Sequence, residues 1–336
     1  MRAGWPESWF SWRKQLPALA DAGFRAVAPD MRGYGSTDSP EDVASFSCVS
    51  IGQDMLALLD ALGEQSAILV GHDWGAILTW QLGLLHPSRF TALCAMSVPP
   101  ILFDSPVPPT QGMRAASGEN FMYILYHNEV FTWSGNHGVA EMEYDAHSEH
   151  MLRQMYFMGP ASSVASLQTT PPTVTDPRRS AGGNRGRAPL RHGFPDWCSE
   201  DEFAYYVAEF EVSPPPLPFD AERLGVLTKV SGGWQRAGWR GGVNYYRNFD
   251  RNWELLQGVA SNPIQQPALF IAGELDPVIG SGGTEGAEAT CRAKCEDLRG
   301  AVFVPDCGHW CQQEKAEEVN AALVGFCRSV TDAAKL

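Results

Sequence analysis

The stretch that most constrains the fold is ILVGHDWGAILTW at residues 68–80, an apolar run that turns abruptly into a helical pattern. Gly71 and Gly75 stand two positions on either side of Asp73. Small residues at this spacing are typical of a nucleophile elbow, a strand-to-helix turn so tight that the central side chain is forced out above the sheet. Serine is the usual central residue, so an aspartate here predicts a carboxylate nucleophile.

Short apolar runs alternate with helical patterns along the chain. We expect strands at FRAVAPDM (24–31), SAILVGHD (66–73), FTALCAMSVP (90–99), PALFIAGELD (267–276) and AVFVPDCG (301–308). The clearest helix is expected to start at Ser50, where SIGQ makes a capping box, and to stop at Gly63. The alternation predicts a doubly wound α/β fold with a mostly parallel sheet, whose active site lies at the carboxyl ends of the strands.

Between about residues 104 and 262 the strand rhythm gives way to aromatic, helical patterns. We predict a helical cap at 104–262, inserted into a core that is formed by residues 1–103 and 263–336. The segment 169–193 is rich in Pro, Gly, Arg and Thr and has no periodicity, which favours a disordered, solvated loop within the cap.

The charge balance of 25 basic and 39 acidic residues gives a net charge of −14, which argues against nucleic acid or an anionic membrane as a partner. The eight cysteines show no CxxC pair and no metal-ligand spacing with histidine, so we expect free thiols and no metal. No apolar run approaches the roughly 18–20 residues of a membrane span. A cytoplasmic protein is expected, or a peroxisomal one if Ala334-Lys335-Leu336 acts as an address signal.

Two further residues complete an elbow-type site. Asp276 ends the run ALFIAGELD, and His309 follows the last predicted strand in PDCGHW; this order of nucleophile, acid and histidine is that of the α/β hydrolases. Asp73 is charged at neutral pH, so it can attack an sp³ carbon without a base and form an alkyl ester. His309, oriented by Asp276, can then activate water against that ester, with the Trp74 N–H holding the oxyanion.

The leaving group decides the substrate. A halide leaves as a stable ion, whereas an epoxide oxygen leaves as a basic alkoxide that needs an acid. Tyrosines in FMYILYH and GVNYYRNFDRNW could supply that acid. The residues therefore favour epoxide hydrolysis and keep a haloalkane or haloacid dehalogenase as an alternative. The many cap aromatics indicate a small hydrophobic epoxide, such as a lipid epoxide or an aryl xenobiotic, with water as co-substrate.

Five segments, GWPESWFSW, APDMRGYGSTDSP, VGHDWGA, VNYYRN and PDCGHWCQQEKAEEVN, resemble the soluble, cytosolic-type epoxide hydrolases of the α/β-hydrolase superfamily. The resemblance runs from about residue 3 to 328, except for the Arg/Gly-rich loop. It implies no cofactor, and it leaves a monomer or a homodimer open. The roles that it implies are Asp73 as nucleophile, His309 as base, Asp276 as orienting acid, Tyr123 and Tyr246 as epoxide-binding acids with Tyr126 and Tyr245 as adjacent decoys, and Trp5 as the second oxyanion N–H.

The sequence departs from this family at its beginning. The family's oxyanion loop begins His-Gly-x-Pro, but Ala3 takes the place of the histidine in Ala3-Gly4-Trp5-Pro6. The strands that precede this loop in the family have no counterpart here. We therefore expect an N-terminally truncated chain with a gapped sheet, and the remaining alternative is an inactive hydrolase fragment.

Overall fold

A computed structural model describes residues 1–101, 103–129, 138–157, 168–170, 190–211, 238–280 and 282–333. Its centre is a four-stranded sheet in the order β1-β2-β5-β6, in which each neighbouring pair is parallel. The strands are Ala67–His72 (β1), Phe90–Met96 (β2), Ala268–Gly273 (β5) and Leu298–Val304 (β6). Four of the five expected strands are thus confirmed, and so is the α/β fold with its parallel sheet.

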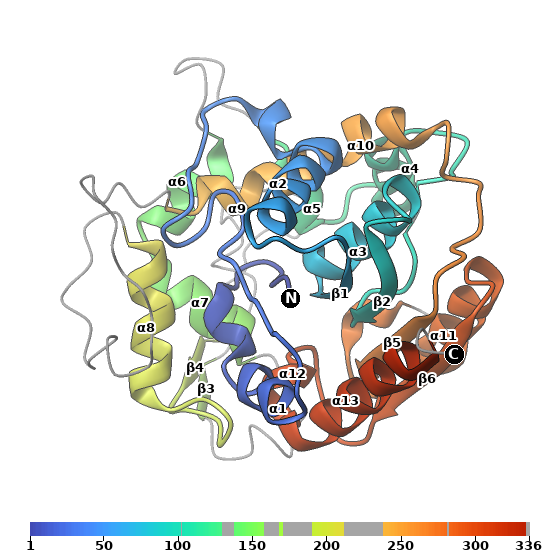
Figure 1. The fold of residues 1–336 in the computed structure, drawn as a ribbon. Helices are drawn as coiled ribbons and strands as arrows, with labels where there is room; N and C mark the ends of the chain where they lie inside the picture. Colours follow the sequence, from blue (N-terminus) through green and yellow to red (C-terminus); the bar gives the residue numbers. More distant parts are fainter. Residues whose placement is uncertain are drawn as a thin grey trace.

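Helices precede, connect and follow these strands (Figure 1). The first group comprises η1 (Trp9–Trp12), α1 (Gln15–Asp21), η2 (Val43–Phe46), α2 (Cys48–Ala61) and α3 (Trp74–Leu85). Between β2 and β5 lie α4 (Pro109–Ser117), α5 (Tyr123–His127), α6 (Val139–Asp145), α7 (Ser148–Tyr156), α8 (Glu200–Phe210), α9 (Arg240–Arg247) and α10 (Phe249–Leu256). The last group comprises η5 (Pro277–Ile279), α11 (Gly283–Lys294), α12 (Cys311–Glu314) and α13 (Ala316–Ala333).

Both faces of the sheet are buried, because alternate residues of each strand pack into different clusters. On β2, Leu93 joins the cluster that includes Ile77 of α3, whereas Cys94 joins the cluster that includes Leu323 of α13. Figure 1 shows α3 beside β1 and β2, and α13 beside β6. A strand that is covered on both faces needs a continuous apolar run, as β5 shows with the sequence ALFIAG, in which every residue is buried.

The expected strand at 24–31 is wrong, since the structure assigns no strand there. A strand needs a neighbour to pair its backbone groups, and within the described residues the outer edge of β1 meets only one bridge, Arg2 with Gly71. The ammonium group of Met1, the residue before the bridge, donates a hydrogen bond to the backbone carbonyl of Val27 in the 24–31 segment. A groove of about 430 Å³ is lined by residues of the 24–31 segment and of β1, including Phe24 and Ile68.

Two local expectations need correction. The helix α2 starts two residues before Ser50, because Ser47 is extended and its Oγ accepts the Ser50 N–H. The expected stop is confirmed, since α2 ends at Ala61 and Gly63 adopts a φ of 74°. The ends of the expected loop at 169–193 form short antiparallel strands, β3 (Gln168–Thr170) and β4 (Leu190–His192), while residues 171–189 lie outside the described residues.

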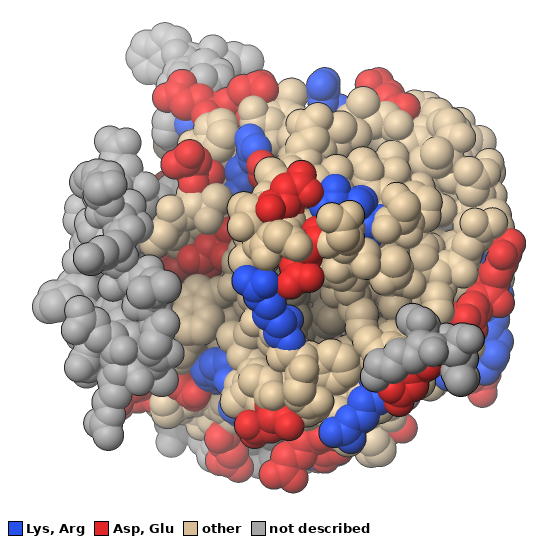
Figure 2. All heavy atoms as spheres, in the orientation of Figure 1, with Lys and Arg blue, Asp and Glu red and all other residues tan. Residues whose placement is uncertain are grey.

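Other expectations meet the structure only in part. All eight cysteines are free and buried, as expected. Among the described helices, none is both long and apolar enough to cross a bilayer. Acidic and basic side chains lie interspersed on the face shown in Figure 2. The tripeptide 334–336 lies outside the described residues, and the division into core and cap stays a prediction.

Candidate active site

Asp73 lies in the tight turn between β1 and α3, as the elbow motif predicts. Its backbone has φ 52° and ψ −115°, a conformation that L-residues rarely adopt. The turn depends on its flanking glycines, since a Cβ on Gly71 would come within 2.0 Å of the Gly75 carbonyl oxygen. The residue is 8% exposed, so the carboxylate is presented to the site from a nearly buried position.

The Asp73 carboxylate is held by backbone donors from two segments. The Trp5 N–H donates to Asp73 Oδ1 at 2.7 Å, and the Trp74 N–H at the start of α3 also stabilises the charged form. Burial raises the pKa of Asp73, whereas the charge of His309 and these N–H groups oppose the rise. The two predicted oxyanion donors therefore lie at the same carboxylate.

Asp276 and His309 lie beside this carboxylate, Asp276 after the end of β5 and His309 after the end of β6. His309 Nε2 lies 3.8 Å from Asp73 Oδ2, and His309 Nδ1 lies 3.0 Å from both carboxylate oxygens of Asp276. Burial lowers the pKa of His309, but the charges of Asp276, Asp73 and Glu7 outweigh it and raise the pKa to about 9. Burial raises the pKa of Asp276, but the charge of His309 and its hydrogen bond outweigh this effect and lower the pKa of that carboxyl.

Tyr123 and Tyr246 face each other across the site from α5 and α9. Their ring centroids are 5.8 Å apart, and both line the same cavity as Asp73. The pKa of each phenol is raised, first by desolvation and further by the charge of Asp73. Both hydroxyls thus keep their protons at neutral pH and can donate them.

The two decoy tyrosines are engaged elsewhere. Tyr126 donates to Glu143 Oε2 at 2.6 Å, and Tyr245 donates to the Arg32 carbonyl at 3.0 Å. Each is adjacent or near in sequence to a site tyrosine, yet neither lines the cavity beside Asp73. These hydrogen bonds therefore distinguish Tyr126 from Tyr123, and Tyr245 from Tyr246.

The cavity beside Asp73 has a volume of about 380 Å³. Its apolar lining includes Ile77, Ile101, Phe103, Met113, Ile124 and Phe249. Within the described parts of the chain, no three His, Cys, Asp or Glu side chains are grouped so that they could hold a metal ion. The cavity can therefore accept a small apolar molecule with its reactive atoms between the carboxylate and the phenols.

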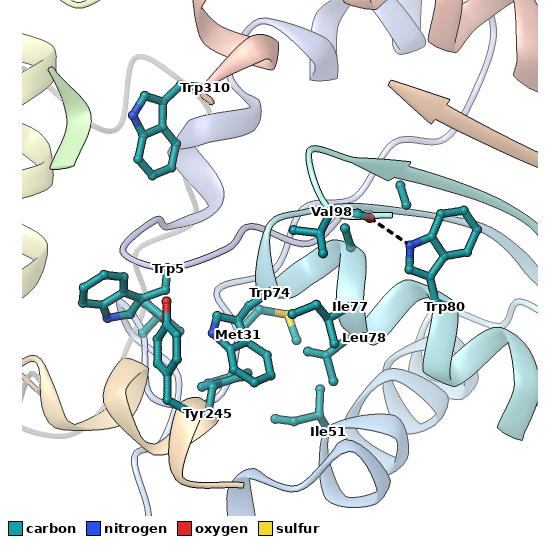
Figure 3. Packing of buried hydrophobic residues seen from close by; sticks show 14 of the residues in the cluster. Trp5, Met31, Ile51, Trp74, Ile77, Leu78, Trp80, Val98, Tyr245 and Trp310 are labelled. Carbon is teal, nitrogen blue, oxygen red and sulfur yellow. Dashed lines mark hydrogen bonds between the residues drawn. The ribbon is translucent and has the colours of Figure 1, made fainter. Parts of the chain in front are cut away.

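Aromatic side chains form one wall of the site. Trp74 packs its ring on Tyr246, with 5.1 Å between ring centroids, and on Tyr245 at 5.8 Å. The Trp5 ring contacts Tyr246 edge-on at 5.4 Å. Figure 3 shows Trp5, Trp74 and Tyr245 within the same buried cluster as Met31 and Ile77.

The sequence reasoning missed a buried polar group next to Asp73. Glu7 Oε2 lies 2.6 Å from His72 Nδ1, and His72 Nε2 lies 2.8 Å from the His309 carbonyl oxygen. Ser97 Oγ also donates to that carbonyl at 3.0 Å. These contacts fix the backbone of His309. The available signal was a glutamate in GWPESW and a histidine directly before Asp73.

A fold-family match and the relatives found among known proteins agree with each other. A profile of the alpha/beta hydrolase fold matches residues 3–316. The chain is 37% identical over 325 residues to Epoxide hydrolase A of Mycobacterium tuberculosis, covering 96% of this chain and 88% of that protein. It is 32% identical to Epoxide hydrolase 3 of Siraitia grosvenorii, covering 96% and 89%.

Solved structures agree with these sequences. The crystal structure of Epoxide Hydrolase A from Mycobacterium thermoresistibile superimposes with a TM-score of 0.77 at 36% identity, covering 97% of this chain and 89% of that chain. The chain therefore belongs to the α/β-hydrolase fold family and, within it, is closely related over nearly its full length to the soluble epoxide hydrolases.

Proposed function

We propose that this protein hydrolyses small hydrophobic epoxides to vicinal diols through an ester on Asp73. The observation that carries the proposal is the placement of the Tyr123 and Tyr246 phenols and the Asp73 carboxylate around one apolar cavity. The relatives named as epoxide hydrolases, at 32–37% identity, support the same reaction.

In the first step, Asp73 attacks an epoxide carbon and the carbon–oxygen bond of the ring breaks. The oxygen accepts a hydrogen bond from Tyr123 and Tyr246 as its negative charge develops, and one phenol transfers its proton. General acid assistance of this kind contributes about 10²- to 10⁴-fold in rate. The product is a hydroxyalkyl ester of Asp73.

The formation of the ester changes the charge state of His309. In the free enzyme the pKa of His309 is about 9, so the imidazole is protonated at neutral pH and cannot act as a base. One of the charges that raises this pKa belongs to Asp73, and the ester has no charge. We therefore expect the pKa of His309 to fall when the ester forms and its proton to pass to solvent, which makes the base available for the second step.

In the second step, neutral His309 takes a proton from water, and the hydroxide attacks the ester carbonyl of Asp73. The N–H groups of Trp5 and Trp74 stabilise the oxyanion. When this intermediate collapses, His309 returns its proton to the leaving alcohol oxygen. The carboxylic acid that remains gives its proton to the tyrosinate. With the charge of Asp73 restored, His309 regains its proton from solvent, so one epoxide and one water yield one diol and the free enzyme.

The test is the mass of a purified His309→Gln variant after incubation with styrene oxide and, separately, with 1-chlorobutane. Loss of the base blocks the second step, so we expect an adduct equal to the whole epoxide on the peptide that contains Asp73. Wild-type protein should show no lasting adduct and should release the diol. An adduct from the chloroalkane alone would overturn the proposal in favour of a dehalogenase.

A further inference from the structure

The two site tyrosines lie on separate short helices, and one arginine connects those helices. Arg247 follows Tyr246 at the end of α9, and its Nε donates to the carbonyl of His127, the last residue of α5, at 3.0 Å. Tyr123 begins the same five-residue helix. Arg247 therefore joins the end of the helix that carries one phenol to the end of the helix that carries the other.

The guanidinium is itself fixed by a buried carboxylate. The two terminal nitrogens of Arg247 donate to the two oxygens of Glu141 on α6, at 2.8 Å and 2.6 Å. The side chains are only 6% and 0% exposed. The pair is planar and bidentate, an arrangement that only arginine can make with a carboxylate.

The surroundings leave this pair little freedom. The Gly138 N–H donates to Glu141 at 2.7 Å, and a Cβ on Gly138 would lie 1.9 Å from an Arg247 nitrogen. Asn128 adds a second link between the helices, since its side-chain amide contacts the carbonyl oxygens of Ile124 at 2.8 Å and Tyr246 at 3.4 Å.

The same pair lies next to the His127 ring, which packs against both phenol rings. The His127 ring centroid lies 4.4 Å from that of Tyr246 and 5.5 Å from that of Tyr123. Burial and the charge of Arg247 lower the pKa of His127, so this ring stays neutral. The spacing of the phenols thus depends on a packed ring whose backbone is held by Arg247.

We propose that Arg247, fixed by Glu141, is the positioning residue that sets the spacing of the Tyr123 and Tyr246 hydroxyls, and so controls acid assistance to the opening epoxide. This inference rests on the proposed function. It assigns Arg247 to the first step alone, because the ester is hydrolysed by groups on the sheet side of the cavity.

The test is an Arg247→Lys variant, which keeps the buried charge but loses the planar fork. Pre-steady-state mixing with styrene oxide separates ester formation from ester hydrolysis. A displacement of about 1 Å costs about 10²-fold, so we expect ester formation to slow by about 10- to 100-fold while ester hydrolysis changes less than about twofold. In a Tyr123→Phe/Tyr246→Phe background the same substitution should have almost no further effect, because the groups that it positions are gone.

Glu202→Gln is the matched control, since it neutralises the carboxylate of another partly buried ion pair, between Glu202 of α8 and Arg13 at 2.6 Å, and Glu202 does not line the cavity. It should leave both rates within about twofold. An equal loss from Arg247→Lys with and without the tyrosine hydroxyls would overturn the positioning role while leaving epoxide hydrolysis intact. A wild-type protein that forms no ester from the epoxide would instead overturn the proposed function and this inference together.

Discussion

The two sides of the cavity hold their polar groups in different ways. On the sheet side, Asp73, Asp276 and His309 each follow a parallel strand, and hydrogen bonds of the backbone fix where those strands end. On the opposite side, Tyr123 and Tyr246 lie on helices of five and eight residues, which are joined by side-chain contacts. Backbone hydrogen bonds therefore fix the polar groups on the sheet side. On the opposite side, the positions of the two tyrosines depend on side-chain packing and on one buried ion pair.

This difference predicts two kinds of mutational effect. Removal of a group on the sheet side should abolish a step, because no neighbouring group can replace it. Removal of a group on the helical side should slow ester formation by a graded amount, because the second phenol still assists.

Asp73→Ala should cause the largest loss, because it removes the carboxylate that attacks the epoxide carbon. We expect diol formation from styrene oxide to fall on the order of 10⁵-fold or more, as for other enzymes that lose their nucleophile. Product chromatography measures the rate, and a thermal melt confirms that the variant is folded. Residual turnover within about 100-fold of wild type would mean that Asp73 is not the nucleophile.

Tyr123→Phe and Tyr246→Phe should each slow ester formation by about 10- to 100-fold, and the double variant by up to about 10⁴-fold. Stopped-flow tryptophan fluorescence can follow this step, since Trp5 and Trp74 lie at the site. Tyr126→Phe is the matched control, because Tyr126 donates to Glu143 instead. A control that slows ester formation as much as the site variants would contradict the separation of the two roles.

The pH dependence should differ between the two steps and give the smallest effect, about tenfold over two pH units on the affected limb. Ester formation needs charged Asp73, so its rate should fall only as the pH drops through the raised pKa of that carboxyl. Ester hydrolysis needs neutral His309, so its rate should rise with pH, with a midpoint below the value of about 9 in the free enzyme. A midpoint for ester hydrolysis that stays at about 9 would break the argument that the ester changes the charge of His309.

The sheet side could be predicted from the sequence because its signals are local. An elbow is encoded within five residues, and the acid and the histidine each follow an apolar run. The expected strand at 24–31 failed for the opposite reason, since a strand exists only where a neighbour pairs with it, and one bridge from Arg2 does not make a ladder.

The supporting groups escaped prediction because their partners are distant in the sequence. Glu7 contacts His72 across 65 residues and Gln312 across 305, and Arg247 contacts Glu141 across 106. Nothing in the local pattern distinguishes such a glutamate from one on a solvated face. The site tyrosines were separable from their neighbours only through the resemblance, and the structure supplies the physical distinction in the hydrogen bonds of Tyr126 and Tyr245.

The central claim, that Asp73 and not water attacks the epoxide, is tested most directly by a single turnover in oxygen-18 water with the enzyme in excess over styrene oxide. The account predicts that the diol of this first turnover carries no label and that the label appears in the peptide containing Asp73, because water attacks the ester carbonyl. A labelled diol with an unlabelled Asp73 peptide would show direct attack by water on the epoxide and would contradict the account.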